Sequence, residues 1–324
     1  MEKPMSKSEN GTADEVQFND RALSLQVRNA ALEPVLTSFK QHVRNIVFLH
    51  ISPHILLSYG YQKMAWFSFF HERAKIDEAK KYSNFDEWFQ QVEEKVKEVA
   101  RTEEARKEFT HHLWETASGD LLELKKDQKV REALRLIQHM TLLLSWTSFE
   151  CLACDSWEAA VNVRPLVLGQ RAFANLPQDT EGIVGLERKS VSVGLLAKHG
   201  FDIRGKLGTL LKSKFDFTGV SGTRKAYVAA FGDKLPLDSI LGDDNLYGLE
   251  VVRHAIVHRA GIADELYLAK THSTIPLGAP IEVDNKMYTA FLSASVDAGC
   301  SLLEHIDRYL SANTEEISPV HENN

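Results

Sequence analysis

Three polar side chains in one short stretch, Leu249 to Gly261, are of types that could carry out chemistry on a phosphate ester. Arg253 is followed by His254, then by three apolar residues and His258. Arginine is a permanent cation whose forked donors match phosphate oxygens better than lysine does. A neutral imidazole can accept a proton near pH 7. These residue types therefore predict proton transfer beside a bound phosphate.

The helix expected over this stretch decides which of these side chains share a face. Apolar residues at helical spacing run through it, at Leu249, Val252, Ile256 and Val257. On an ideal helix Arg253 and His258 point about 140° apart, whereas His254 and His258 are only about 40° apart. One helix therefore does not easily place Arg253 and His258 against the same phosphate. The alternative is an ordinary amphipathic core helix with arginine and histidine at its edge.

A long helix is expected before the motif, from Val130 to about Val163, and Pro165 ends it. Glu150 lies in an apolar part of this helix. A buried carboxylate needs a cationic partner, and Arg253 and Arg259 are the candidates. Alternatively, Glu150 lies at the solvent-exposed edge of the helix.

Taken together, these features resemble the HEPN domains. The resemblance rests on the R-x4-H spacing of Arg253 to His258 and on the aromatic and acidic residues from Trp146 to Glu150. It also rests on the G-I-A-D segment Gly261 to Asp264, since G-I-x-D often follows the motif helix in that family. The similarity covers about residues 126–312 and is to the stand-alone bacterial ribonuclease type. It implies a helical bundle that cleaves RNA through 2'-hydroxyl attack, without metal or cofactor.

The resemblance also suggests roles for individual residues. The expected catalytic residues are Arg253, His254 and His258, and the expected supporting residues are Glu150, Glu250 and Asp264. The position after the motif arginine is often Asn or Asp in the family, but it is His254 here. This departure leaves open whether His254 carries a proton or only orients the phosphate.

The resemblance further implies partners and a biological role. The expected partners are RNA, a second copy of the chain, and an antitoxin or other regulatory protein, in a toxin or antiphage defence system. A homodimer would bring Arg253 of one copy near His258 of the other, and two-fold dimers are the commonest oligomers. Trp146 and Trp157 are candidates for the interface, or else for the core. The alternative function is a non-catalytic HEPN-like module that binds RNA, nucleotide or protein.

Positive charge is concentrated before the motif. From Glu187 to Lys225 there are nine basic and three acidic residues, in a chain whose net charge is −7. The residues expected to contact an RNA backbone are Arg204, Lys206, Lys212, Lys214, Arg224 and Lys225. The alternative is a solvated rim of charged loops.

Two motifs resemble metal sites, but we expect no metal. Glu250, His254 and His258 repeat every four residues on one helix face, without a further cluster of ligands. Cys151 and Cys154 form a C-x-x-C pair with no second pair downstream, so small buried thiols are favoured over zinc. With three cysteines in all, the chain lacks a disulfide framework and suits a reducing compartment.

The rest of the sequence predicts a soluble cytoplasmic protein, since the N-terminus lacks the apolar region of a signal peptide. The 25 residues from Ile46 to Phe70 are largely apolar. We expect two buried helices there, broken at Pro53 and Gly60, rather than a membrane span.

The predicted fold class is all-α, with helical bundles in two parts. Residues 1–20 are expected to be a disordered tail, 21–125 a helical region of unassigned role, 126–312 the HEPN-like domain, and 313–324 a loose tail. The 44% of hydrophobic residues suffices for real cores in a chain of this length.

Overall fold

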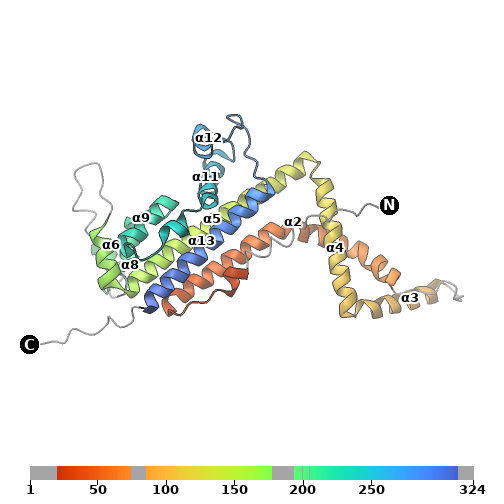
Figure 1. Ribbon diagram of the computed structural model, residues 1–324. Coiled ribbons are helices and arrows are strands. Elements are labelled where there is room, and N and C mark those ends of the chain that lie inside the picture. Colours follow the sequence, from red (N-terminus) through yellow and green to blue (C-terminus); the bar gives the residue numbers. More distant parts are fainter. Residues whose placement is uncertain (1–19, 74–84, 177–192, 199, 204, 313–324) are drawn as a thin grey trace, which may run out of the picture. The chain divides into compact units, whose positions relative to one another are not determined.

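The computed structural model describes residues 20–73, 85–176, 193–198, 200–203 and 205–312 (Figure 1). Across these ranges the regular elements are helices and there is no strand, which confirms the all-α prediction. A single isolated bridge joins Ile262 to Pro280. The chain divides into two compact units. The smaller unit is Phe48–Gln138, and the larger unit contains the described residues before Phe48 and after Gln138.

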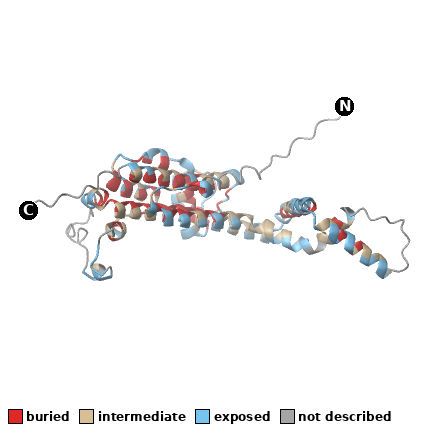
Figure 2. Ribbon diagram, turned by 90° about the horizontal axis from the view of Figure 1, so that it is seen from below, coloured by how far each residue is buried: buried red, intermediate tan, exposed pale blue. Residues whose placement is uncertain are grey.

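The larger unit is organised around three long elements: the first part of α2 (Glu33–Arg73), α5 (Gln128–Val163) and α13 (Asn285–Ala312). They lie side by side within this unit, and buried residues gather along their facing sides (Figure 2). The motif helix α11 (Asp244–Arg259) packs against α13. One continuous hydrophobic core joins these helices.

Shorter elements complete this unit. They are η1 (Ala30–Leu32), η2 (Pro165–Gly169), α6 (Gln170–Ala174), α7 (Val193–Lys198), α8 (Leu207–Leu211), η3 (Lys212–Lys214), α9 (Val220–Phe231), α10 (Leu237–Leu241) and α12 (Glu265–Thr271). The helix expected to end at Pro165 does end there: α5 stops at Val163, and Pro165 opens a π-helical turn.

The expected boundary near residue 125 differs from the observed division. Leu32, Phe39 and Ile46 are buried in the same core as the C-terminal helices. Phe39 packs so closely on α13 that a Cβ added at Gly299 would lie 2.9 Å from its ring. The carboxylate of Asp307 also accepts hydrogen bonds from the backbone N–H groups of Arg28 and Asn29. The start of the chain is therefore part of the motif-bearing unit, because its apolar face covers helices that come much later in sequence.

The expectation of two helices broken at Pro53 and Gly60 is wrong. Helix α2 runs through both residues. Pro53 has no N–H to donate to the Leu49 carbonyl, and the hydroxyl of Ser52 donates to that carbonyl instead, at 2.8 Å. The helix is also less buried than expected, since Phe48, Leu56 and Tyr59 are exposed. None of the helices described here has a stretch long and apolar enough to cross a bilayer.

The smaller unit contains the end of α2, α3 (Phe85–Ala100), α4 (Glu103–Leu124) and the first turns of α5. Its core is made of Phe69, Phe70, Val92, Val96, Ala105, Phe109 and Leu113. Thr102 ends the turn between α3 and α4 and caps α4, since its side chain accepts from the Ala105 N–H.

Candidate functional site

Helix α11 is held at both ends by local chemistry. The Asp243 carboxylate accepts from the Asn245 and Leu246 N–H groups at the first turn. At the other end Gly261 has a positive φ of 76°, and its N–H donates to the Ala255 carbonyl at 3.1 Å. A Cβ at Gly261 would also lie 2.6 Å from a ring carbon of His139 on α5. The helix ends at its C-cap Ala260, which is already left-handed with a φ of 54°, and Gly261 follows as the expected glycine after the helix.

Arg253 reaches α5 and faces Glu150. Its Nη2 atom lies 3.8 Å from Oε2 of Glu150, and both side chains are half-buried. Of the two arginines expected to face Glu150, Arg253 is therefore the one that does. Burial raises the pKa of Glu150, while the positive charge of Arg253 and the nearby Trp146 indole lower it. The negative charges of Asp216 and Glu250 raise it further.

The two motif histidines lie on the outer face of the helix. The rings of His254 and His258 contact each other, with centroids 4.5 Å apart and planes inclined by 46°. His258 is exposed, and His254 is half-buried. Burial lowers the pKa of His254, and the positive charges of His258 and Lys270 lower it further. His254 is thus held in the neutral form that accepts a proton.

Asp264 organises the turn that follows the motif. Its carboxylate caps α12 by accepting from the Tyr267 N–H at 2.8 Å, and it pairs with Arg259 at 3.1 Å. The Tyr267 N–H and the Arg259 charge hold the pKa of Asp264 below its usual value. The negative charge of Asp264 raises the pKa of His254, whereas the positive charge of Lys270 lowers it. Asp264 thus supports the motif by positioning α12 beside it.

Glu250, the third expected supporting residue, contacts a different helix. Its Oε2 atom accepts a hydrogen bond of 2.9 Å from the N–H of Val220, at the N-terminus of α9. A Cβ at Gly219 would lie 2.9 Å from the Glu250 carboxylate, so a larger residue there would displace this carboxylate. Glu250 therefore ties α9 to α11. Within the described residues, no three His, Cys, Asp or Glu side chains gather closely enough to hold a metal ion.

Two of the basic residues expected to contact RNA have acidic partners within the chain. Lys212 forms an ion pair with Glu158, and Arg224 forms one with Asp238. Both acidic partners lie outside the sequence window in which the charges were counted. Lys225 is exposed and acts on Asp216, whose pKa it helps to lower.

The other expected contacts are less accessible or are not described. Lys206 and Lys214 are half-buried. Arg204 lies outside the residues that the structure describes, as do Arg188 and Lys189. The local charge imbalance therefore overstates the positive surface that the described residues offer.

The expected thiols are free and not reactive. Cys151 and Cys154 are half-buried and Cys300 is buried. Burial raises the pKa of Cys154 to about 11 and that of Cys300 to about 12, so both stay protonated at neutral pH. Trp146 and Trp157 are fully buried in the core, so neither is available to an interface.

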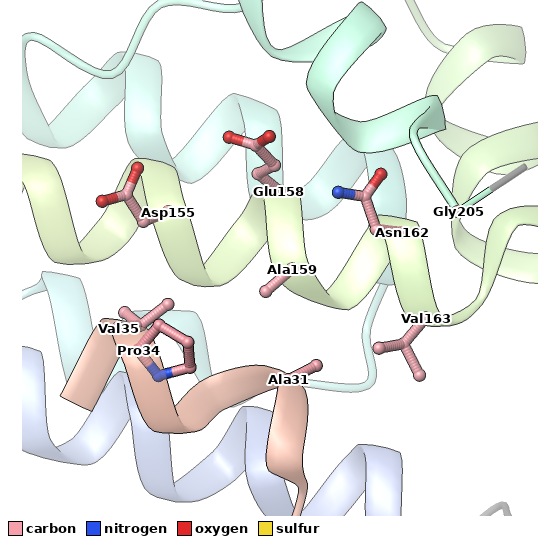
Figure 3. Close-up of a pocket in the computed structure, with 9 residues that line it drawn as sticks. All are labelled: Ala31, Pro34, Val35, Asp155, Glu158, Ala159, Asn162, Val163 and Gly205. Atoms are coloured by element: carbon pink, nitrogen blue, oxygen red, sulfur yellow. The ribbon is translucent and has the colours of Figure 1, made fainter. Parts of the chain in front are cut away.

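A cavity of about 500 Å³ lies elsewhere in the larger unit, between the start of α2 and α5 (Figure 3). Asp155 and Glu158 stand on its wall, above the apolar side chains of Pro34, Val35 and Val163. The Glu158 carboxylate is paired with Lys212, and no Lys or Arg is among the described residues that line the cavity, so it offers a phosphate no cation. The motif on α11 is therefore the better candidate for a phosphate-directed site.

Lys270 is a residue of the candidate site that the sequence did not indicate. It lies on α12, and its charge reaches His254 because the turn at Asp264 folds α12 back beside α11. Comparisons with protein-family models, curated proteins and solved structures found no match to this chain.

Proposed function

We propose that this chain is a metal-independent endoribonuclease whose site is centred on α11. The observation that carries the proposal is the pairing of His254, whose pKa is lowered, with the exposed ring of His258, on the helix that also presents Arg253. Two adjacent imidazoles, one of them neutral, suit a reaction that needs both a base and an acid. The resemblance to HEPN ribonucleases points to the same residues.

In the proposed reaction His254 takes the proton from a ribose 2'-hydroxyl. The 2'-oxygen then attacks the adjacent phosphorus, and the bond to the 5'-oxygen of the next nucleotide breaks. Protonated His258 gives its proton to that leaving oxygen, which becomes a 5'-hydroxyl, and the other product ends in a 2',3'-cyclic phosphate. Arg253 stabilises the negative charge that develops on the phosphate oxygens.

The site is proposed to assemble in a homodimer. Arg253 lies toward Glu150, whereas His254 and His258 lie on the outer face of α11, so one chain does not bring all three side chains to the same phosphate. A second copy would supply its Arg253 to the histidines of the first. The apolar side chains of Val257 on α11 and Leu266 on α12 are 52% and 44% exposed. Exposed apolar groups beside a polar site are suited to such an interface.

The test is to incubate the purified chain with total RNA in EDTA and to analyse the ends of the products. Fragments with 2',3'-cyclic phosphate and 5'-hydroxyl ends support the proposal. Intact RNA that nevertheless remains bound would instead favour the second candidate, a non-catalytic module. A role in toxin or defence systems and control by an antitoxin follow from the resemblance, and they belong to the same proposal together with the cytoplasmic location expected from the sequence.

A further inference from the structure

A second candidate site lies in the smaller unit, far in sequence from the motif. A pocket of about 470 Å³ opens at the turn between α3 and α4, against the end of α2. The side chains that matter here are Trp66, Phe70, Lys97, Arg101, Arg106 and Phe109. A pocket of this size is within the range that accommodates a small organic ligand.

Aromatic rings form one side of this pocket. Phe70 and Phe109 are buried in the core of the unit, with ring centroids 5.1 Å apart. Trp66 is half-buried and packs on Phe70, with centroids 5.4 Å apart. Because Phe70 and Phe109 are fixed by the core, they hold Trp66 as a firm surface for a flat, apolar group.

Three cations also line the pocket. The Nε of Arg106 donates to the Ala100 carbonyl at 2.8 Å, which anchors the guanidinium at the turn and leaves its terminal nitrogens for another partner. Arg101 is exposed beside it. Lys97 also lines the pocket, and its charge is balanced by Glu93, with which it is paired along α3.

The sign of the charge distinguishes this pocket from the cavity in Figure 3. No Asp or Glu is among the described residues that line it, whereas Asp155 and Glu158 line the cavity in Figure 3. A ligand for the smaller unit's pocket must therefore combine negative charge with an apolar, flat body. Two arginines in the lining, Arg101 and Arg106, favour a phosphate, whose oxygens accept several forked donors at once.

We propose that this pocket binds a nucleotide, with the base against Trp66 and the phosphate at Arg101 and Arg106. Aromatic side chains that stack on bases beside cations that hold the backbone are a general means of nucleotide binding. The nucleotide is either free or one unit of a single strand. The proposal does not depend on the α11 reaction, because it concerns binding only.

The test measures binding of the full chain to three probes: AMP, ATP and a 5'-phosphorylated oligodeoxythymidine. The deoxy strand has no 2'-hydroxyl and cannot be cleaved by the reaction proposed for α11. The affinity is compared between the native chain, an Arg101→Gln/Arg106→Gln chain and a Trp66→Leu chain. Arg131→Gln, an exposed arginine of the same unit that is not part of the pocket, is the matched control.

We expect the double arginine change to weaken binding roughly tenfold or more, since it removes charge-assisted hydrogen bonds. Trp66→Leu should weaken it roughly fivefold to a hundredfold if the base stacks on the indole. Arg131→Gln should bind as the native chain does. Equal binding of mononucleotides and the strand identifies a free nucleotide, and binding of the strand alone identifies single-stranded nucleic acid.

Three results would overturn the proposal. The first is no binding of any probe by the native chain. The second is a double arginine variant that binds as well as Arg131→Gln does. The third is competition by pyrophosphate, or by an acidic peptide, that is as strong as competition by AMP, together with unchanged binding by Trp66→Leu. The base would then play no part in binding. Circular dichroism of each variant separates these outcomes from a loss of folding.

Discussion

The guanidinium of Arg253 faces the carboxylate of Glu150 across the α11–α5 contact, with Nη2 3.8 Å from Oε2. This separation is longer than a hydrogen bond, so charge rather than a directed bond relates the two groups. Both side chains remain partly exposed, at 26% and 22%. The pair thus orients Arg253 without using up its donors, as a residue that binds a phosphate requires.

The first prediction concerns His258. Replacing His258 with Ala should lower the rate of RNA cleavage by roughly 10²–10⁴, the usual contribution of general acid–base catalysis. His258 is exposed, so the fold should survive. The rate is measured on a labelled RNA, with His111→Ala, an exposed histidine of the smaller unit, as the control. Cleavage by His258→Ala at the native rate would show that the site is wrongly assigned.

The second prediction concerns Glu150. Its pKa is raised above its ordinary value of 4.5, mainly by burial, so the folded chain binds this proton more tightly than the unfolded chain does. The ionised carboxylate therefore lowers stability at neutral pH. This effect is lost as the pH falls through the raised pKa, and it is gone below the ordinary value of 4.5. Glu150→Gln should have an equal or higher free energy of unfolding at pH 7, and the difference should shrink toward low pH.

The same change should lower RNA cleavage, because Arg253 loses the charge that orients it. Denaturant unfolding at several pH values, together with the cleavage rate, checks both effects. A Glu150→Gln chain that is markedly less stable at pH 7 would contradict the assigned effect of burial. A matched change is Glu123→Gln, an exposed glutamate paired with Lys126.

The third prediction concerns the pH dependence of cleavage. The pKa of His254 lies below its ordinary value of 6.5, so this imidazole stays neutral as the pH falls until the lowered pKa is reached. If His254 is the base, the acid limb of the kcat/KM profile should have its midpoint below pH 6.5. Lys270→Gln should move that midpoint upward, since Lys270 is one of the charges that lower the pKa. A midpoint that Lys270→Gln leaves unchanged would argue against His254 as the base.

The fourth prediction concerns metals. Cleavage should proceed unchanged in EDTA and leave 2',3'-cyclic phosphate ends, because the proposed reaction uses only protein groups and the 2'-hydroxyl. End-group analysis by mass spectrometry checks the products. Activity that EDTA abolishes and zinc restores would favour the alternative in which Glu250, His254 and His258 hold a metal. In that case Glu250 would have to give up its hydrogen bond with the Val220 N–H.

The fifth prediction concerns the dimer. Light scattering should give twice the mass of one chain, and Val257→Asp should produce monomers with greatly reduced activity. Mixing an Arg253→Ala chain with a His258→Ala chain should restore part of the activity. In the mixed dimer one site receives the intact arginine from one copy and the intact histidine from the other. A monomer that cleaves RNA at the full rate would refute the idea.

Local patterns in the sequence were sufficient to predict the individual helices around the site. The structure confirms the periodic apolar residues of α5 and α11, the end of α5 before Pro165 and the glycine after the motif. Each of these features depends on interactions between residues close together in sequence. The four-residue spacing of His254 and His258 also predicted that they share a face of the helix, and their rings are in contact.

Local patterns were misleading at Pro53, where a helix break was expected. The hydroxyl of Ser52 satisfies the carbonyl that the proline leaves without a donor, so α2 continues. They were also misleading at the expected boundary near residue 125. The apolar side chains of the first part of α2, including Phe39, find their partners on α13, more than two hundred residues later.

Only the tertiary structure decided the polar contacts between distant residues. It pairs Glu150 with Arg253 rather than with Arg259, and it joins Glu250 to the start of α9. It also places acidic partners against Lys212 and Arg224, which a count of charges along the chain cannot detect. The physical reason is that helix formation depends on neighbours in sequence, whereas ion pairs depend on how apolar faces from separate helices pack.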